Sequence, residues 1–113
     1  MDTLRYAILN ALSNEDRLVI ADYMENAHMG LKIALKLTFV FAFPKSYSKK
    51  KRARLLDQAH TIKPDLDNLV KNVLDRGNGI LWVDDKYIYQ ISALKKWGNT
   101  DKIELEIEYE RNE

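Results

Sequence analysis

The amino-acid sequence predicts an α+β fold, in which helices pack on one mostly antiparallel or mixed β-sheet. Apolar residues occupy every second position from 33 to 43, as in a strand with one buried face. Residues 66–74 place apolar side chains at the i, i+3, i+4, i+7, i+8 spacing of a helix with one buried stripe. Residues 103–109 alternate apolar side chains with Glu, which predicts a half-exposed strand. A chain of 113 residues that is 46% hydrophobic suits one domain over residues 1–113.

Residues 1–30 are expected to form a helical N-terminal segment. Within residues 4–12, apolar side chains recur at helical spacing, and this pattern predicts a first helix (Leu4, Ile8 and Leu12). A second helix is expected to begin at Ser13 or Asn14, because either side chain can cap it, and to run to about residue 27. Three residues are expected to form its buried stripe: Val19, Tyr23 and Ala27.

The rest of the chain is expected to alternate strands and helices. Pro44 ends the strand of residues 33–43, and residues 46–60 are expected to form a short basic helix or loop capped by Ser46 or Ser48. Four further segments follow from the same kind of pattern: a turn at 76–79, an apolar run at 80–83, a strand at 87–94 and a turn at 98–99.

Composition and charge restrict the class of protein. The sequence contains no Cys, so disulfides and thiolate metal sites are excluded. No signal peptide is visible and the longest apolar run, residues 37–43, is too short to span a bilayer, so we expect a cytoplasmic protein without a membrane partner. The net charge is only +1, but one segment holds six basic residues: Lys45, Lys49, Lys50, Lys51, Arg52 and Arg54. These side chains could neutralise DNA phosphates, or they could simply be solvated.

A cluster of carboxylates is the candidate catalytic site. Asp65 and Asp67 lie at an extended-to-helix junction, where both can point into one site, and Asp84 and Asp85 follow the next turn. Lys71 continues the i, i+4 series from Asp67, on the face away from the apolar stripe. Carboxylate oxygens and waters are the usual ligands of Mg²⁺, and such a metal with a neighbouring ammonium suits phosphodiester hydrolysis.

The same aspartates also allow an interpretation without a metal. Asp65 could be a helix N-cap, and Asp67 could stabilise the positive end of the helix. Asp67 and Lys71 could form an exposed ion pair worth about 0.3–0.5 kcal/mol, while Asp84 and Asp85 could belong to a turn.

The spacing of these residues resembles a known family. An Asp-x-Asp-Asn-x-x-Lys core covers residues 65–71, Lys63-Pro64 precedes it, and an Asp-Asp pair follows at 84–85. Between them stand Leu74-Asp75 and Asn78-Gly79-Ile80. This pattern resembles the RusA family of Holliday junction resolvases, from about Leu31 to Tyr109. The segment from Phe43 to Lys51 is similar to its phage and prophage branch.

The resemblance implies a homodimeric endodeoxyribonuclease of DNA recombination and repair, with a nuclease core over residues 31–110. Such an enzyme would use Mg²⁺, with Mn²⁺ as a substitute, to nick four-way DNA junctions symmetrically. By matching position, the catalytic residues would be Asp65, Asp67, Asp85 and Lys71, with Asp84 beside them as a further metal ligand. The DNA-binding residues would be the six basic residues of the 45–54 segment and Lys63.

One departure from the family keeps a second hypothesis open. The family usually opens with a β-hairpin, whereas residues 4–12 here have a helical pattern. A non-catalytic DNA-binding or phage regulatory protein that keeps the fold is therefore the alternative. His28 and His60 are far apart in sequence, so no zinc site is expected and both are interpreted as surface histidines.

Overall fold

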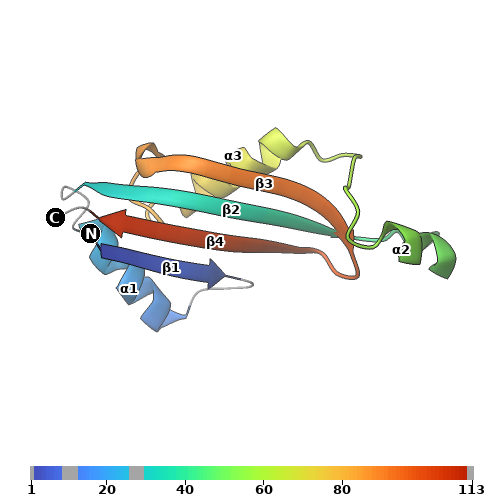
Figure 1. Ribbon diagram of the computed structural model, residues 1–113, viewed down its shortest axis with the longest axis horizontal. Helices are drawn as coiled ribbons and strands as arrows, with labels where there is room; N and C mark the ends of the chain where they lie inside the picture. Colours follow the sequence, from blue (N-terminus) through green and yellow to red (C-terminus); the bar gives the residue numbers. More distant parts are fainter. Residues whose placement is uncertain (1, 9–12, 26–29, 112–113) are drawn as a thin grey trace.

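The computed structural model describes residues 2–8, 13–25 and 30–111. For residues 2–8 it describes the backbone alone. The elements follow one another as β1 (Asp2–Ile8), α1 (Asn14–Glu25), β2 (Leu31–Ala42), α2 (Lys49–Leu55), α3 (Leu66–Gly77), the 3₁₀ turn η2 (Asp85–Tyr87), β3 (Ile88–Gly98) and β4 (Lys102–Arg111). The molecule is elongated, measuring 54 × 26 × 22 Å, and α2 projects beyond one end of the sheet (Figure 1).

One four-stranded mixed sheet organises the fold, in the order β1-β4-β2-β3. β4 pairs antiparallel with both β1 and β2, whereas β2 and β3 are parallel. Parallel neighbours need a crossover connection, and the segment with α2 and α3 supplies it. The α+β class with a mixed sheet is therefore confirmed.

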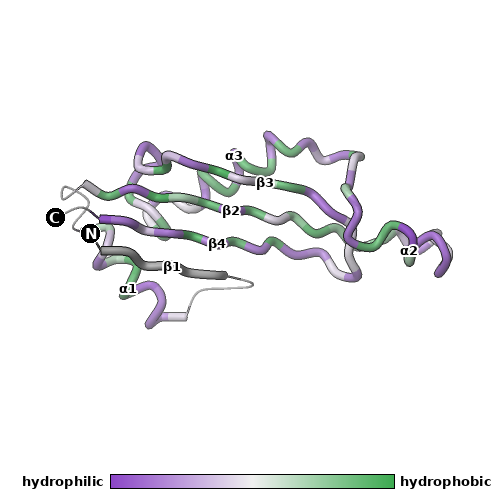
Figure 2. The backbone as a smooth tube through the Cα atoms, in the orientation of Figure 1, coloured by the Kyte–Doolittle hydropathy of each residue, from purple (hydrophilic) through white to green (hydrophobic). Residues whose placement is uncertain are grey.

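The hydrophobic core lies on one face of this sheet. The alternating apolar residues of β2 are buried, as the sequence predicted, and they join Ile107 and Tyr109 of β4. α1 adds Ile20 and Tyr23 to this core, and the apolar stripe of α3 packs against it through Leu69, Val70, Val73 and Leu74. On the opposite face, β4 carries Lys and Glu side chains, and β2 carries Lys32, Lys36 and Thr38 between smaller apolar residues, so hydropathy varies along both strands (Figure 2). Both helices thus cover the same face of the sheet.

The predicted helix over residues 4–12 is wrong. Residues 2–8 form β1, which pairs along its whole length with β4. Leu4, Tyr6 and Ile8 occupy every second position opposite Tyr109, Ile107 and Leu105, so a period of two fits this segment as well as the helical one. Pairing with a distant strand decided between the two patterns. Leu12 lies outside the described residues.

The second helix is confirmed as α1, with a different buried stripe. Ser13 caps it in a reciprocal capping box, because its hydroxyl accepts from the Asp16 backbone N–H at 3.1 Å while the Asp16 carboxylate accepts from the Ser13 N–H at 2.9 Å. Ile20 and Tyr23 face the core, whereas Val19 is 43% exposed. Ala27 lies outside the described residues.

The two remaining helices begin where the sequence placed their caps. The Ser48 hydroxyl accepts from the Lys51 backbone N–H at 3.1 Å and caps α2. α3 begins directly after Asp65 and continues to Gly77, into the predicted turn at 76–79. No helix of the described residues combines the length and apolar character needed to cross a membrane.

Candidate active site and DNA-binding surface

The start of α3 presents two carboxylates. Asp65 occupies the N-cap position with an extended backbone, but its side chain makes no capping hydrogen bond. Asp67 lies in the first turn, and both side chains are exposed. Neither carboxylate has a hydrogen bond or ion pair with another described residue. Their oxygens are thus available to a ligand, and Asp65 occupies the predicted N-cap position without a hydrogen bond from its side chain to the helix.

A loop anchored in the core carries the second carboxylate pair toward α3. Trp82 is fully buried, and its indole N–H donates to the Leu74 carbonyl at 3.2 Å. The Tyr109 hydroxyl donates to the Leu81 carbonyl at 2.7 Å, which ties the same loop to β4. A Cβ at Gly77 would lie 2.2 Å from the Trp82 ring, so only glycine leaves room for the indole. Packing beneath the loop therefore fixes the position of the backbone just before Asp84 and Asp85.

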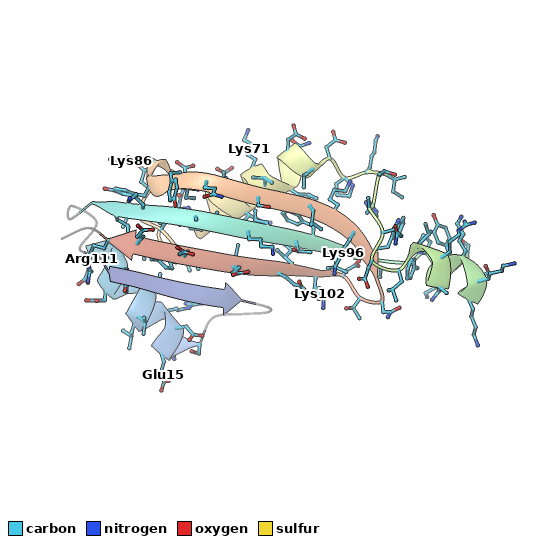
Figure 3. All side chains as sticks on the ribbon, in the orientation of Figure 1. Glu15, Lys71, Lys86, Lys96, Lys102 and Arg111 are labelled. Carbon is cyan, nitrogen blue, oxygen red and sulfur yellow. The ribbon has the colours of Figure 1, made fainter. Side chains whose placement is uncertain are left out.

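Asp84 and Asp85 have different environments. The Asp84 carboxylate accepts from the Lys86 backbone N–H at 2.9 Å and caps η2, as the turn interpretation predicted. Asp85 instead lines an open groove of about 710 Å³ together with Asp67, Lys71 and Asp75 of α3. Lys71 and Lys86 both lie along the long edge of the molecule formed by α3 and β3 (Figure 3). The fold thus places Asp67, Lys71 and Asp85 on one groove, although the two carboxylates are 18 positions apart in sequence.

Asp65 lies in a neighbouring groove of about 570 Å³, beside His60, Lys63 and Lys95. The two grooves share Leu66 and Ala93, so they are adjacent. Within the described ranges, no three His, Asp or Glu side chains approach closely enough to form a metal-binding group. The predicted convergence of Asp65, Asp67, Asp84 and Asp85 on one point is therefore not formed in this chain alone.

The donor set of the 710 Å³ groove nevertheless fits a hard divalent cation. Asp67 and Asp85 contribute carboxylate oxygens, and Mg²⁺ usually takes one or two carboxylates while keeping several waters. Asp75 also lines this groove. Its i+8 spacing from Asp67 indicates from the sequence that the two residues lie along one side of the helix. The series Asp67, Lys71, Asp75 borders the flank of α3 that faces β3, since Val70, Leu74 and Ala93 line the same groove. All three side chains are exposed, and they lie beside the apolar stripe of α3.

Comparison with known protein families matches residues 7–108 to the family described as endodeoxyribonuclease RusA. The chain belongs to this family. The match covers nearly the whole chain, including the carboxylate motif and the loop that carries Asp85. A comparison with curated proteins finds no match. The resemblance inferred from the motif is therefore confirmed at the level of the RusA family, which is a family of endodeoxyribonucleases.

In this RusA-family chain, the basic residues of the 45–54 segment divide into two groups. The Arg52 guanidinium donates to the carbonyls of Tyr47 at 3.0 Å and Pro44 at 3.2 Å, and Lys51 lies 3.8 Å from the centroid of the Tyr47 ring. These two side chains thus hold α2 against the segment before it. The other side chains are exposed, and within the described part of the chain they have no ion pair (Lys45, Lys49, Lys50 and Arg54).

His60 is buried, so the expectation of a surface histidine is wrong for this residue. Its ring stacks on Phe41 with 4.3 Å between centroids and lies 4.4 Å from Trp97. Nδ1 has no hydrogen-bond partner in the described structure. Burial, with the nearby positive charge of Lys95, lowers the pKa of His60, because both disfavour the imidazolium form. His28 lies outside the described residues.

The lowered pKa of His60 predicts a loss of stability in mild acid. Below the unfolded-state value of 6.5, the unfolded chain binds a proton that the folded chain resists, so the free energy of unfolding should fall as pH drops from 7.5 to 5.5. Urea denaturation followed by circular dichroism at the two pH values measures this loss. We expect a smaller loss in His60→Gln than in the wild type. Equal losses in His60→Gln and the wild type would contradict the assignment.

Proposed function

We propose that this chain is a Mg²⁺-dependent, structure-selective endodeoxyribonuclease that resolves four-way DNA junctions by paired nicks, with Mn²⁺ as a substitute metal. One observation carries the proposal: Asp67 and Asp85, from separate parts of the motif, line the same groove as Lys71. Membership of the RusA family supports the nuclease class. The groove is open and lies on the surface, as a site for a DNA backbone must.

The residues have separable roles in this proposal. Asp67 and Asp85 would hold the metal, with Asp65 supplying a further carboxylate from the adjacent groove. A metal held by these residues would supply an activated water as the nucleophile and would stabilise charge on the leaving oxygen. The Lys71 ammonium would neutralise the charge that develops on the phosphoryl group. Asp84 would act on the site through the backbone of η2, because its carboxylate caps that turn.

Recognition of the substrate would depend mainly on shape and charge. The exposed residues of α2 and its flank can contact phosphates, and α2 projects far enough from the sheet to reach along DNA (Figure 1). We also propose a homodimer, because a twofold axis would present two such sites to the two opposing strands of a near-symmetric junction.

Neutralising α2 should weaken DNA binding and its salt dependence. In the variant Lys49→Gln/Lys50→Gln/Arg54→Gln, we expect the slope of log K against log salt to fall by up to about 2.7, because each phosphate contact contributes about 0.9. Fluorescence anisotropy with a labelled junction, without divalent metal, measures the slope between 50 and 200 mM salt. The matched control Lys32→Gln removes a charge that pairs with Glu110 at 3.8 Å. An unchanged slope in the triple variant would exclude α2 from the DNA-binding surface.

The direct test uses purified protein, a synthetic four-way junction and Mg²⁺ or Mn²⁺. Paired nicks at symmetric positions would support the proposal, and linear duplex of the same sequence should be cut far more slowly. Junction binding without nicks at any metal concentration would instead favour the non-catalytic DNA-binding protein. The dimer proposal is tested in parallel by sedimentation, which should give twice the chain mass of 13.2 kDa.

A further inference from the structure

We propose that Lys95 is a positioning residue of the nuclease site, which fixes the peptide before Asp65 and thereby orients that carboxylate. This inference depends on the proposed function for its catalytic consequence. The structural link can be tested without any activity. Lys95 is outside the motif that identified the other site residues.

The contacts of Lys95 link β3 to the segment before α3. Its ammonium donates hydrogen bonds to two backbone carbonyls, those of Ile62 and Pro64. Its own backbone carbonyl accepts from the His60 N–H at 3.1 Å. The side chain is half-buried on the core-facing side of the sheet, in register with Phe39. One residue thus holds this segment through both its backbone and its side chain.

The position of these contacts marks where the chain leaves the sheet. Residues 57–60 pair with the outer edge of β3, since the Asp57 N–H donates to the Trp97 carbonyl and the Trp97 N–H donates to the Gln58 carbonyl, both at 3.0 Å. Backbone pairing with β3 ends at His60. From Thr61 to Pro64, the Lys95 ammonium replaces it as the connection to the sheet.

The hydrogen bond to Pro64 acts directly on Asp65. The Pro64 carbonyl and the Asp65 amide belong to one rigid peptide plane, so fixing the oxygen also fixes the direction in which the Asp65 Cα leaves that plane. The Asp65 carboxylate makes no capping hydrogen bond. Its orientation therefore depends on the backbone, and hydrogen bonds from an ammonium to carbonyls are stronger than neutral ones.

The geometry favours positioning over direct contact with DNA. Of the three donors of the ammonium, the protein already uses two. Lys96, the next residue, points to the opposite face of the sheet and pairs with Asp57 at 3.2 Å, and it lies near the turn between β3 and β4 (Figure 3). Lys96→Met is thus a matched control, with the same change one position away.

The experiment compares Lys95→Met, Lys96→Met and the wild type by three measurements. We expect the backbone order parameters of residues 61–66, measured by NMR relaxation, to fall below about 0.6 in Lys95→Met, the range of flexible backbone. We expect Mn²⁺ affinity, measured by electron paramagnetic resonance, to fall about 10–100-fold, the usual effect of removing a group that orients a metal ligand. Junction affinity without metal should stay within twofold of the wild type, and Lys96→Met should match the wild type throughout.

Two results would overturn the proposal. Unchanged backbone order parameters at residues 61–66 would show that Lys95 does not fix this segment, whether or not the wild type cleaves DNA. Weaker junction binding with a salt slope reduced by about one would make Lys95 a phosphate contact instead. A wild type that cuts no junction would refute the proposed function, while the comparison of order parameters would still decide the structural link. Lys95→Arg, which keeps donors for both carbonyls, should recover most of the wild-type order parameters and serves as the second variant if Lys95→Met does not fold.

Discussion

Asp67→Asn is expected to lower the rate of junction cleavage at least about 100-fold while leaving junction binding within twofold of the wild type. The substitution keeps the shape of the side chain and removes the charge that would hold the metal. A bound metal supplies on the order of several kcal/mol of transition-state stabilisation, and each 1.36 kcal/mol is tenfold in rate. Asp67 is exposed and has no hydrogen bond or ion pair with another described residue, so the free energy of unfolding should change by less than about 0.5 kcal/mol.

Single-turnover cleavage of a labelled junction across a range of Mg²⁺ concentrations measures this effect. Glu106→Gln is the matched control, because it removes one exposed carboxylate from β4, outside both grooves. Asp75→Asn removes a charge from the same groove, but Asp75 is not one of the residues assigned to catalysis. We therefore expect this substitution to lower the cleavage rate less than tenfold. If Asp67→Asn cleaves the junction at the wild-type rate at low Mg²⁺, Asp67 does not hold the metal. If Asp67→Asn and Asp75→Asn lose the same activity, the effect comes from the total negative charge of the groove and not from a specific role of Asp67.

Trp82→Ala is expected to reduce the free energy of unfolding by about 3–5 kcal/mol, the range for large aromatic residues truncated in a core. Trp82 is fully buried, packs on Gly77 and donates to the Leu74 carbonyl. A domain of this size has a total stability of about 5–15 kcal/mol, so this loss is a large share of it. The loop that leads to Asp85 depends on the same packing, and cleavage should fall with stability.

Urea denaturation followed by circular dichroism measures the loss, and Leu18→Ala is the control because Leu18 is 72% exposed. Trp82→Phe keeps an apolar ring but removes the N–H donor, so it should lie between Trp82→Ala and the wild type. A loss below about 1 kcal/mol in Trp82→Ala would mean that the indole does not support this loop as the structure indicates.

Much of the fold follows from the sequence because its elements bury one face each. β2 has a large apolar residue at every second position, β4 alternates apolar and polar residues, and the apolar stripe of α3 follows helical spacing, so local periodicity was enough to predict both the type of element and the face that it buries. Capping chemistry is equally local, and the hydroxyls of Ser13 and Ser48 mark two of the helix starts. The Asp-x-Asp-Asn-x-x-Lys pattern was sufficient to indicate the RusA family.

Pairing between distant segments decided the rest. Residues 2–8 fit both a helical and a strand pattern, and only β4 beside them selects the strand. The aromatic rings of Phe41 and Trp97 bury His60. The Arg52 guanidinium donates hydrogen bonds to carbonyls in the segment before α2. Asp84 and Asp85 are neighbours with the same chemistry, yet one caps η2 and the other lines the groove that Asp67 also lines. The sequence by itself determined most of the helices and strands after residue 13 and the family, because periodicity and capping are local. Only the tertiary structure decided which carboxylates share a groove, because that depends on contacts between residues far apart in the chain.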